Sequence, residues 1–246
     1  LNRNSMRHIF ITGVSSGIGH ALSLELLRRG EMVYGVSRRS PADLLEQPNF
    51  RHAVVDLTDH KTAAEGVKQL LADVHHLHLA ILNAGILASF GDMAETSLDE
   101  LRQVMEVNVW ANKTVIDALF DGDREVEQIV TISSGASVNG NRGWNGYSVS
   151  KAALNMLTML YAQEREATHF CALAPGIVDT FMQQQVADEP EDERFPALAR
   201  LRAKRGTEEM PTPEQAAANL LDQIDRLPQL VESGSFADVR KPPLAK

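Results

Sequence analysis

Residues 8–19 read HIFITGVSSGIG, a short apolar run that passes into a glycine-rich turn. Residues 8–12 are predicted to form a β-strand, and the helical spacing of the apolar residues after the turn predicts a helix over residues 17–29. Glycines let a backbone approach a pyrophosphate closely, and a helix N-terminus offers it unpaired N–H groups. The stretch therefore predicts a nucleotide-binding turn at the start of an α/β fold, although its G-x-x-x-G-x-G spacing differs from the strict G-x-G-x-x-G pattern.

The same alternation of Val- and Ile-rich runs with helical segments continues along the chain. Further strands are predicted at residues 32–36, 51–55, 77–82, 127–132, 170–174 and 235–239, and helices at residues 61–72, 98–120 and 147–165 and after Thr212, a predicted N-cap. This order predicts right-handed crossovers and one doubly wound parallel sheet of about seven strands, with helices on both faces. No linker divides the chain, so we expect residues 1–246 to form a single domain.

Composition excludes several classes of protein. The 246 residues are 43% apolar and 23% charged, which excludes a disordered chain, and the net charge of −9 argues against nucleic acid or an anionic membrane as partner. No apolar stretch approaches the roughly 18 residues of a membrane span. Residues 1–7 lack the apolar core of a secretory signal, and a single cysteine, Cys171, fits a reducing compartment. We therefore expect a cytoplasmic protein.

The end of the second predicted strand bears on the choice of dinucleotide. An acidic side chain at this position binds the ribose 2′-hydroxyl of NAD and repels the additional phosphate of NADP. This chain has Ser37, Arg38 and Arg39 instead. A guanidinium binds phosphate through two parallel hydrogen bonds. The sequence therefore favours NADP(H) over the alternative of two solvated surface arginines.

Three polar residues are predicted to meet at the carboxyl edge of the sheet, where α/β folds bind ligands. Tyr147 and Lys151 are four residues apart in a helical segment and thus share one face, and Ser134 follows the fifth predicted strand. A nearby ammonium lowers the pKa of a tyrosine and allows general acid–base catalysis, while a serine hydroxyl can hold the substrate oxygen. A tyrosine and a lysine at this spacing are common on helix surfaces, so the prediction depends on all three residues.

In the order and spacing of these motifs the chain resembles the short-chain dehydrogenase/reductase family along nearly its whole length. The resemblance also includes Asn83-Ala84-Gly85, Asn108 and the thirteen-residue step from Ser134 to Tyr147, which selects Ser134 over Ser133. It implies a Rossmann-type fold and reduction of a small-molecule carbonyl by NADP(H). Tyr147 would protonate the carbonyl oxygen, Lys151 would lower the tyrosine pKa and bind the nicotinamide ribose, Ser134 would orient the carbonyl, and Asn108 would hold a water of the proton relay.

The resemblance also implies which residues contact the cofactor. Asp56 and Leu57 would meet the adenine, and Thr180 the carboxamide. Many NADP-dependent members carry a basic residue where this chain has Ser16, which leaves Arg38 as the main ligand of the 2′-phosphate. The full implied set is Gly13, Ser15, Ser16, Gly17, Ile18, Gly19, Arg38, Asp56, Leu57, Asn83, Ala84, Gly85, Tyr147, Lys151, Pro175, Gly176, Val178 and Thr180.

Residues 174–184 and 233–238 resemble the matching stretches of sepiapterin reductases and of related bacterial benzil reductases, which implies a vicinal dicarbonyl substrate. Asp238 matches an aspartate that anchors the pterin, although it could instead cap or pair near the last strand. Trp144 could line the substrate pocket or pack in the core. Residues 180–210 are acidic and interrupted by prolines, and we interpret them as a substrate lid, the alternative being a surface excursion without a role.

Three histidines, His75, His76 and His78, precede the fourth predicted strand. No carboxylate or cysteine set completes a site with them, so we predict no metal. Helices 98–120 and 147–165 carry more apolar surface than one sheet contact requires, and partner subunits in the resembled family use these helices. We therefore expect a homo-oligomer, a dimer or a tetramer.

Two other functions are alternatives to a reductase. A non-catalytic NADP(H)-binding sensor would typically lack the active tyrosine or lysine, whereas Tyr147 and Lys151 are both present. An epimerase or dehydratase of the longer members of the superfamily would need an additional C-terminal substrate domain, for which 246 residues leave no room.

Overall fold

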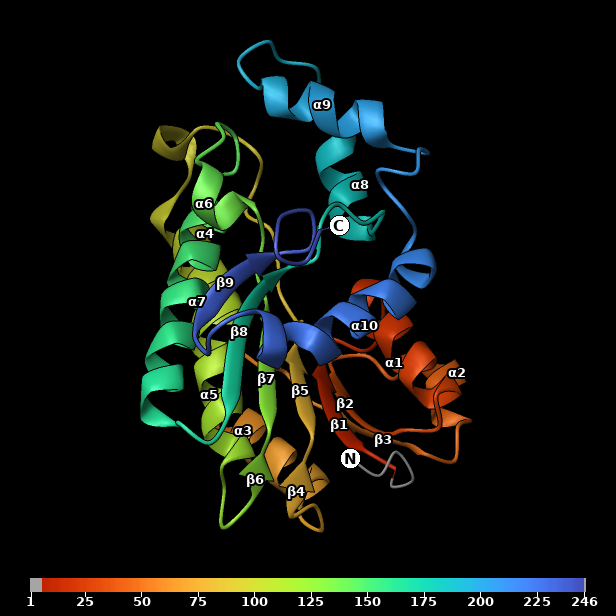
Figure 1. The fold of residues 1–246 in the computed structure, drawn as a ribbon. Helices are drawn as coiled ribbons and strands as arrows, with labels where there is room; N and C mark the ends of the chain where they lie inside the picture. Colours follow the sequence, from red (N-terminus) through yellow and green to blue (C-terminus); the bar gives the residue numbers. More distant parts are fainter. Residues whose placement is uncertain (1–5, 246) are drawn as a thin grey trace.

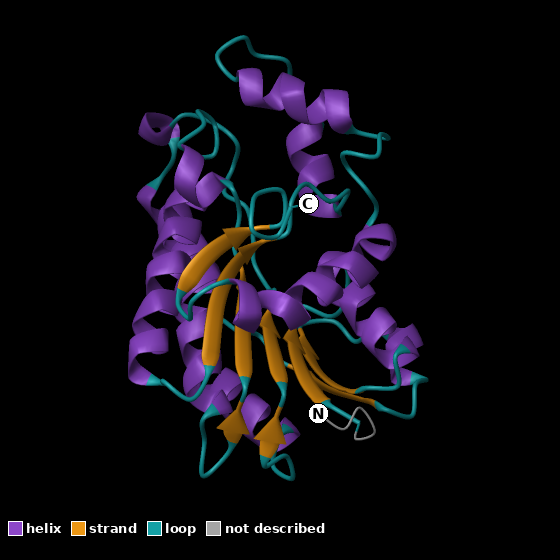
Figure 2. Ribbon diagram, in the orientation of Figure 1, coloured by secondary structure: helices purple, strands orange, loops and turns teal. Residues whose placement is uncertain are grey.

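A computed structural model describes residues 6–245 in three layers, with helices on both faces of a central sheet (Figures 1 and 2). Residues 1–5 lie outside the described part. The expectation that the chain has no secretory signal depends mostly on these residues. Within residues 6–245, no helix has both the length and the apolar character needed to cross a bilayer.

The main sheet has seven strands in the order β3-β2-β1-β5-β7-β8-β9, and every neighbouring pair is parallel. The strand order reverses between β1 and β5, which is where open α/β sheets bind ligands. The strands are β1 His8–Thr12, β2 Met32–Ser37, β3 Phe50–Val54, β5 Leu79–Leu82, β7 Gln128–Ile132, β8 His169–Ala174 and β9 Ser235–Asp238. The predicted doubly wound parallel sheet is thus confirmed.

Alternate strand residues face two separate cores, as expected for a sheet covered on both sides. Ile9 and Ile11 pack with helices α1 and α10, whereas Phe10 packs with α3, α5 and α7. Helix α1 lies directly against α10 although the two are at opposite ends of the chain. The helices are α1 Gly17–Arg28, α2 Ala42–Leu45, α3 His60–Leu70, α4 Leu98–Met105, α5 Ala111–Leu119, α6 Ala136–Asn139, α7 Asn145–Glu164, α8 Phe181–Ala187, α9 Pro196–Lys204 and α10 Pro213–Leu230.

Three predicted segments differ from the structure in detail. The predicted strand 77–82 is divided, because β4 His76–Leu77 pairs with β6 Glu125–Val126 in a small separate sheet. The predicted helix 98–120 is interrupted by one π-helical turn, Glu106–Trp110, which an apolar periodicity cannot reveal. The excursion at 180–210 contains helices α8 and α9, and a short 3₁₀ turn, Met93–Glu95, precedes α4.

The predicted N-cap of the last helix is confirmed. The Thr212 hydroxyl accepts a hydrogen bond from Gln215 N–H, and the Gln215 side chain accepts one from Thr212 N–H, which forms a complete capping box.

Candidate active site

The carboxyl ends of β7 and β8 and the start of α7 bring together the three predicted catalytic residues. Tyr147 is buried, and the Ser134 side chain, which follows β7, lies close enough to affect its pKa. Ser133 points elsewhere, because its hydroxyl donates to Asn155 Oδ1 at 2.5 Å. The geometry therefore agrees with the choice of Ser134 over Ser133.

Burial dominates the ionisation of the tyrosine. It raises the pKa of Tyr147 to about 12, and the nearby Ser134 side chain opposes that rise. The Lys151 Nζ lies 5.7 Å from the Tyr147 ring centroid. The expected lowering of the tyrosine pKa by this ammonium is therefore not found, because burial raises the pKa instead.

Lys151 is itself buried, which lowers its pKa to about 8. Its Nζ donates a hydrogen bond to the Ile132 carbonyl at 2.7 Å, and this contact fixes the amine at the end of β7. A Cβ on Gly85 would lie 3.5 Å from Lys151 Nζ and 3.1 Å from Asn108 Oδ1. Gly85 therefore allows the backbone after β5 to lie against both side chains.

Asn108 sits on the π-helical turn and is fully buried. Its Oδ1 accepts from Ile86 N–H at 2.8 Å, and its Nδ2 donates to the Ile86 carbonyl at 2.9 Å and to Ser150 Oγ at 3.0 Å. The side chain thus holds the loop after β5 against α7. The expected relay water stays a prediction.

The glycine-rich turn has the shape of a phosphate cradle. Gly13 and Gly17 adopt φ of +76° and +61°, a region that favours glycine, and a Cβ on Gly19 would overlap Asn83 Nδ2 and the Gly13 carbonyl oxygen. Ser16 is the N-cap of α1, yet its side chain caps no backbone N–H, and the first turn of α1 has no acidic residue. The turn therefore leaves hydroxyl and N–H donors for an anion.

A hydrogen-bond network ties this turn to the loop after β5. Thr12 Oγ1 accepts from the N–H groups of Asn83 and Ala84 at 2.9 Å each, and Asn83 Nδ2 donates to the Thr12 carbonyl at 3.1 Å. These hydrogen bonds thus hold together the loop after β1 and the loop after β5, which flank the point where the strand order reverses.

Arg38 lies exposed at the end of β2 and near Asp56, whose pKa is lowered mainly by hydrogen bonds from Thr58 and further by the Arg38 charge. Among residues 6–245, neither Arg38 nor Arg39 forms an ion pair with an acidic side chain. The Arg38 guanidinium is therefore available to an anion at the adenosine end of the cradle. Leu57 packs against the neighbouring core.

The loop after β8 closes over the glycine turn. Gly176 has φ of +82°, Val178 is buried, and a Cβ on Gly17 would lie 3.6 Å from Thr180 Cγ2. Thr180 Oγ1 accepts from Gln183 N–H at 3.3 Å and so caps α8. Thr180 thus lies between the glycine-rich turn and α8, and its expected contact with the carboxamide stays a prediction.

An aromatic cluster adjoins Tyr147. Phe90 contacts Trp144 and Phe195 edge to face, with ring centroids 5.5 and 5.1 Å apart, and the Trp144 ring centroid lies 5.9 Å from that of Tyr147. Phe195 comes from the 180–210 segment, directly before α9. The structure therefore places Trp144 beside Tyr147, and the 180–210 segment packs on Phe90 and Trp144.

Ion pairs fasten this segment to the rest of the site. Arg142 donates two hydrogen bonds of 2.6 Å to the carboxylate of Asp92, and Arg194 donates to the same carboxylate at 3.2 Å. Both guanidiniums also lie over the Phe195 ring, 5.6 and 4.9 Å from its centroid. The sequence does not single out Phe90, Asp92 and the two arginines, because their contacts join three loops that are far apart in the chain.

Asp238 ends β9 and is buried, and its carboxylate binds Arg240 through two hydrogen bonds of 2.9 and 2.7 Å. Asp238 therefore pairs with a neighbouring side chain, which was the alternative to a role in binding a pterin. The carboxylate that would bind a pterin is already hydrogen-bonded to a guanidinium.

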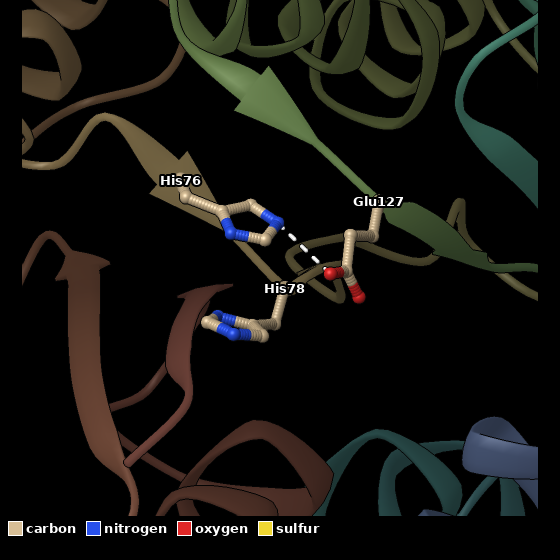
Figure 3. Close-up of side chains that lie close together, drawn as sticks. All are labelled: His76, His78 and Glu127. Atoms are coloured by element: carbon tan, nitrogen blue, oxygen red, sulfur yellow. Dashed lines mark ion pairs between the residues drawn. The ribbon is translucent and has the colours of Figure 1, made fainter. Parts of the chain in front are cut away.

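The expectation that no carboxylate accompanies the histidine cluster is wrong. Glu127 lies beside His76 and His78, and its Oε1 is 2.9 Å from His76 Nε2 (Figure 3). The cluster is at the opposite edge of the sheet from Tyr147.

Comparison with known proteins agrees with this geometry. Residues 7–191 match the family model described as short chain dehydrogenase. A benzil reductase ((S)-benzoin forming) of Bacillus cereus is 30% identical over 245 residues, which cover 91% of this chain and 97% of that protein. A second, from Bacillus subtilis (strain 168), is 28% identical over 247 residues, covering 96% and 99%. A solved short-chain dehydrogenase/reductase from Saccharomyces cerevisiae has a TM-score of 0.81 at 24% identity and covers 97% of this chain and 98% of its own.

Proposed function

Because the chain belongs to the short-chain dehydrogenase family of oxidoreductases, which use a nicotinamide cofactor, we propose that it is an NADPH-dependent carbonyl reductase. Its proposed substrate is one ketone of a vicinal dicarbonyl. The observation that carries the proposal is the buried Tyr147 with Ser134 and Lys151 close to it, at the same sheet edge as a glycine-rich turn whose backbone lies open to an anion.

When bound, the reduced nicotinamide supplies a hydride to the carbonyl carbon. The Ser134 hydroxyl donates a hydrogen bond to the carbonyl oxygen, and the Tyr147 phenol donates its proton to the same oxygen, so that an alcohol forms. Burial keeps the pKa of Tyr147 high, and the phenol is therefore protonated at neutral pH, which is the form that a reduction requires. The ammonium of Lys151 then stabilises the phenolate that remains.

The proposed preference for NADPH rests on the end of β2. No carboxylate occupies the position that would bind the 2′-hydroxyl of NAD, and the exposed Arg38 offers a planar guanidinium to the 2′-phosphate. Ser16 supports this preference for NADPH, because its side chain makes no capping hydrogen bond to the backbone of α1.

The aromatic cluster supports an aryl-substituted dicarbonyl. The Trp144 ring centroid lies 5.9 Å from that of Tyr147, and Phe90 and Phe195 extend this flat apolar surface through edge-to-face contacts. The two bacterial relatives are described as benzil reductases, and benzil carries a phenyl group on each side of its diketone. A pterin substrate is less well supported, because Arg240 already binds the carboxylate of Asp238.

The test follows the loss of reduced-nicotinamide absorbance with NADPH and NADH in parallel. The substrates are benzil, 1-phenyl-1,2-propanedione, sepiapterin and a simple monoketone. We expect the aryl diketones to be reduced fastest, and faster with NADPH than with NADH. Tyr147→Phe removes only the hydroxyl, so we expect it to lower kcat by about 10²–10⁴-fold, the usual contribution of a general acid, while NADPH still binds.

Survival of turnover in Tyr147→Phe, with folding and NADPH binding intact, would overturn the mechanism. Tight NADPH binding without reduction of any carbonyl in the panel would instead favour the sensor alternative.

A further inference from the structure

A second cluster of potential ligand atoms lies at the amino-terminal edge of the sheet. The strand register brings these residues together. Leu77 pairs with Val126 in the small sheet and Ala80 pairs with Ile129 in the main sheet, so the two chain segments keep one register across both sheets. His78 and Glu127, each at the junction between the small sheet and the main sheet, are therefore neighbours on adjacent strands. His76 lies two residues before His78 in the same extended segment, so both side chains are on one face.

We propose that His76, His78 and Glu127 form a binding site for a divalent transition-metal ion of the Zn²⁺ class. One ligand atom from each residue lies within 4.8 Å of the other two. The two imidazoles stack with ring centroids 4.5 Å apart, and the carboxylate reaches across from the neighbouring strand (Figure 3). Two imidazoles and one carboxylate are a ligand set that suits Zn²⁺, with water in the remaining positions.

The existing contacts show what binding through His78 requires. The His8 N–H donates a hydrogen bond to His78 Nδ1 at 3.1 Å, so the neutral ring carries its proton on Nε2. An ion bound at Nε2 takes the place of that proton, and the ring then carries its proton on Nδ1 and loses the hydrogen bond from His8. Metal bonds of about 2.1 Å place two ligand atoms at most about 4.2 Å apart. Rotation of the exposed His76 and Glu127 side chains closes the remaining gap.

The site is structural rather than catalytic. Glu127 immediately precedes β7 and Ser134 follows it at the other end, so the five-residue strand, at about 3.3 Å per residue, separates the two sites. A bound ion would join the β4–β5 junction to the β6–β7 junction. We therefore expect it to stabilise the amino-terminal edge of the sheet without entering the reaction.

The experiment is calorimetric titration of Zn²⁺ into the full chain, purified without a histidine tag and stripped of metal. We expect one ion per chain, and at least tenfold weaker binding in each of His76→Ala, His78→Ala and Glu127→Gln. His75→Ala is the matched control, because His75 is an exposed histidine of the same segment outside the cluster, and it should bind as the wild type does. Far-UV circular dichroism and the metal-free Tm verify folding, and Zn²⁺ should raise the Tm of the wild type but not of Glu127→Gln.

Three results would overturn the proposal. The first is the absence of stoichiometric binding, and the second is equal binding in all three cluster variants. The third is a loss in His75→Ala as large as that in His76→Ala, which indicates chelation by exposed histidines in general. His76 and Glu127 are exposed, so their variants keep the test valid if His78→Ala fails to fold.

Discussion

Lys151 carries a titratable amine in a buried position, where the charged form is disfavoured. Its pKa of about 8 in the folded chain, against an ordinary value of 10.5, means that the unfolded chain binds this proton more tightly. The contribution of this group to the free energy of unfolding therefore rises as the pH increases from about 8 to 10.5. In the folded chain, the lowered pKa also keeps a fraction of the amine neutral near pH 8. The residue that supports the phenolate is thus held at a cost to the fold.

We therefore expect Lys151→Met to abolish turnover but to stabilise the chain at pH 7 relative to the wild type. The shift corresponds to about 3 kcal/mol, less the cost of leaving the Ile132 carbonyl without its donor. Urea unfolding of the wild type and of Lys151→Met at pH 7 and pH 10 measures this difference in the free energy of unfolding. The two stabilities should converge at the higher pH, and a difference that does not change with pH would contradict the explanation.

Single residues also mark the limits of prediction from sequence. The prediction of Ser134 over Ser133 depends on a local spacing, and the structure adds that the Ser133 hydroxyl is hydrogen-bonded to Asn155. The partnership of His78 with Glu127 depends on strand register between segments distant in sequence, so no local pattern reveals it. The pairing of Asp238 with Arg240 could be expected from their separation by two residues, but not its bidentate geometry.

At the scale of elements, the strands and long helices were predictable because buried parallel strands are nearly continuous apolar runs. The π-helical turn and the helices α8 and α9 were not, because they depend on tertiary contacts made by Asn108 and by the aromatic cluster. Asp92 is central to one such contact, since two arginines from different loops share its carboxylate. We propose that the contact of Arg142 and Arg194 with Asp92 holds the 180–210 segment in place as a lid over the substrate.

Asp92→Asn should therefore loosen the lid. We expect KM for the aryl diketone to rise several-fold while NADPH binding is unchanged, because Asp92 is not among the residues of the cradle. Hydrogen bonding to Arg142 lowers the pKa of Asp92, so the contact persists above that pKa and is lost as the pH falls through it. Steady-state kinetics and limited proteolysis of residues 188–195 measure the effect. Asp99→Asn, which breaks an exposed pair with Arg102, is the control, and an equal effect there would refute the role of the lid.

At the scale of the molecule, one side of the described chain presents an unpartnered apolar stripe. Val149, Met156 and Leu160 recur along one face of α7 and are 51, 54 and 53% exposed, and Trp110 at the start of α5 is 46% exposed. A patch of this kind is typical of an interface. We propose that a second copy of the chain covers it.

Leu160→Glu should then shift the protein toward the monomer in light scattering coupled to size-exclusion chromatography, because a charge would be buried in the interface. Leu45→Glu is the matched control, since Leu45 is 51% exposed on α2 and lies outside the stripe. A wild-type monomer, or a mixture unchanged by Leu160→Glu, would contradict the assignment.

The packing of α1 against α10 has a consequence for synthesis. Leu22 and Leu26 of α1 share a core cluster with Leu220 and Ile224 of α10, so α1 is covered by a helix made much later in synthesis. During translation α1 leaves the ribosome long before α10, and its apolar face stays exposed until α10 follows. Such a nascent chain offers a hydrophobic surface to chaperones while the segment between the two helices is made. A stop codon placed before residue 213 should accordingly yield an aggregating product, although it spares Ser134, Tyr147 and Lys151.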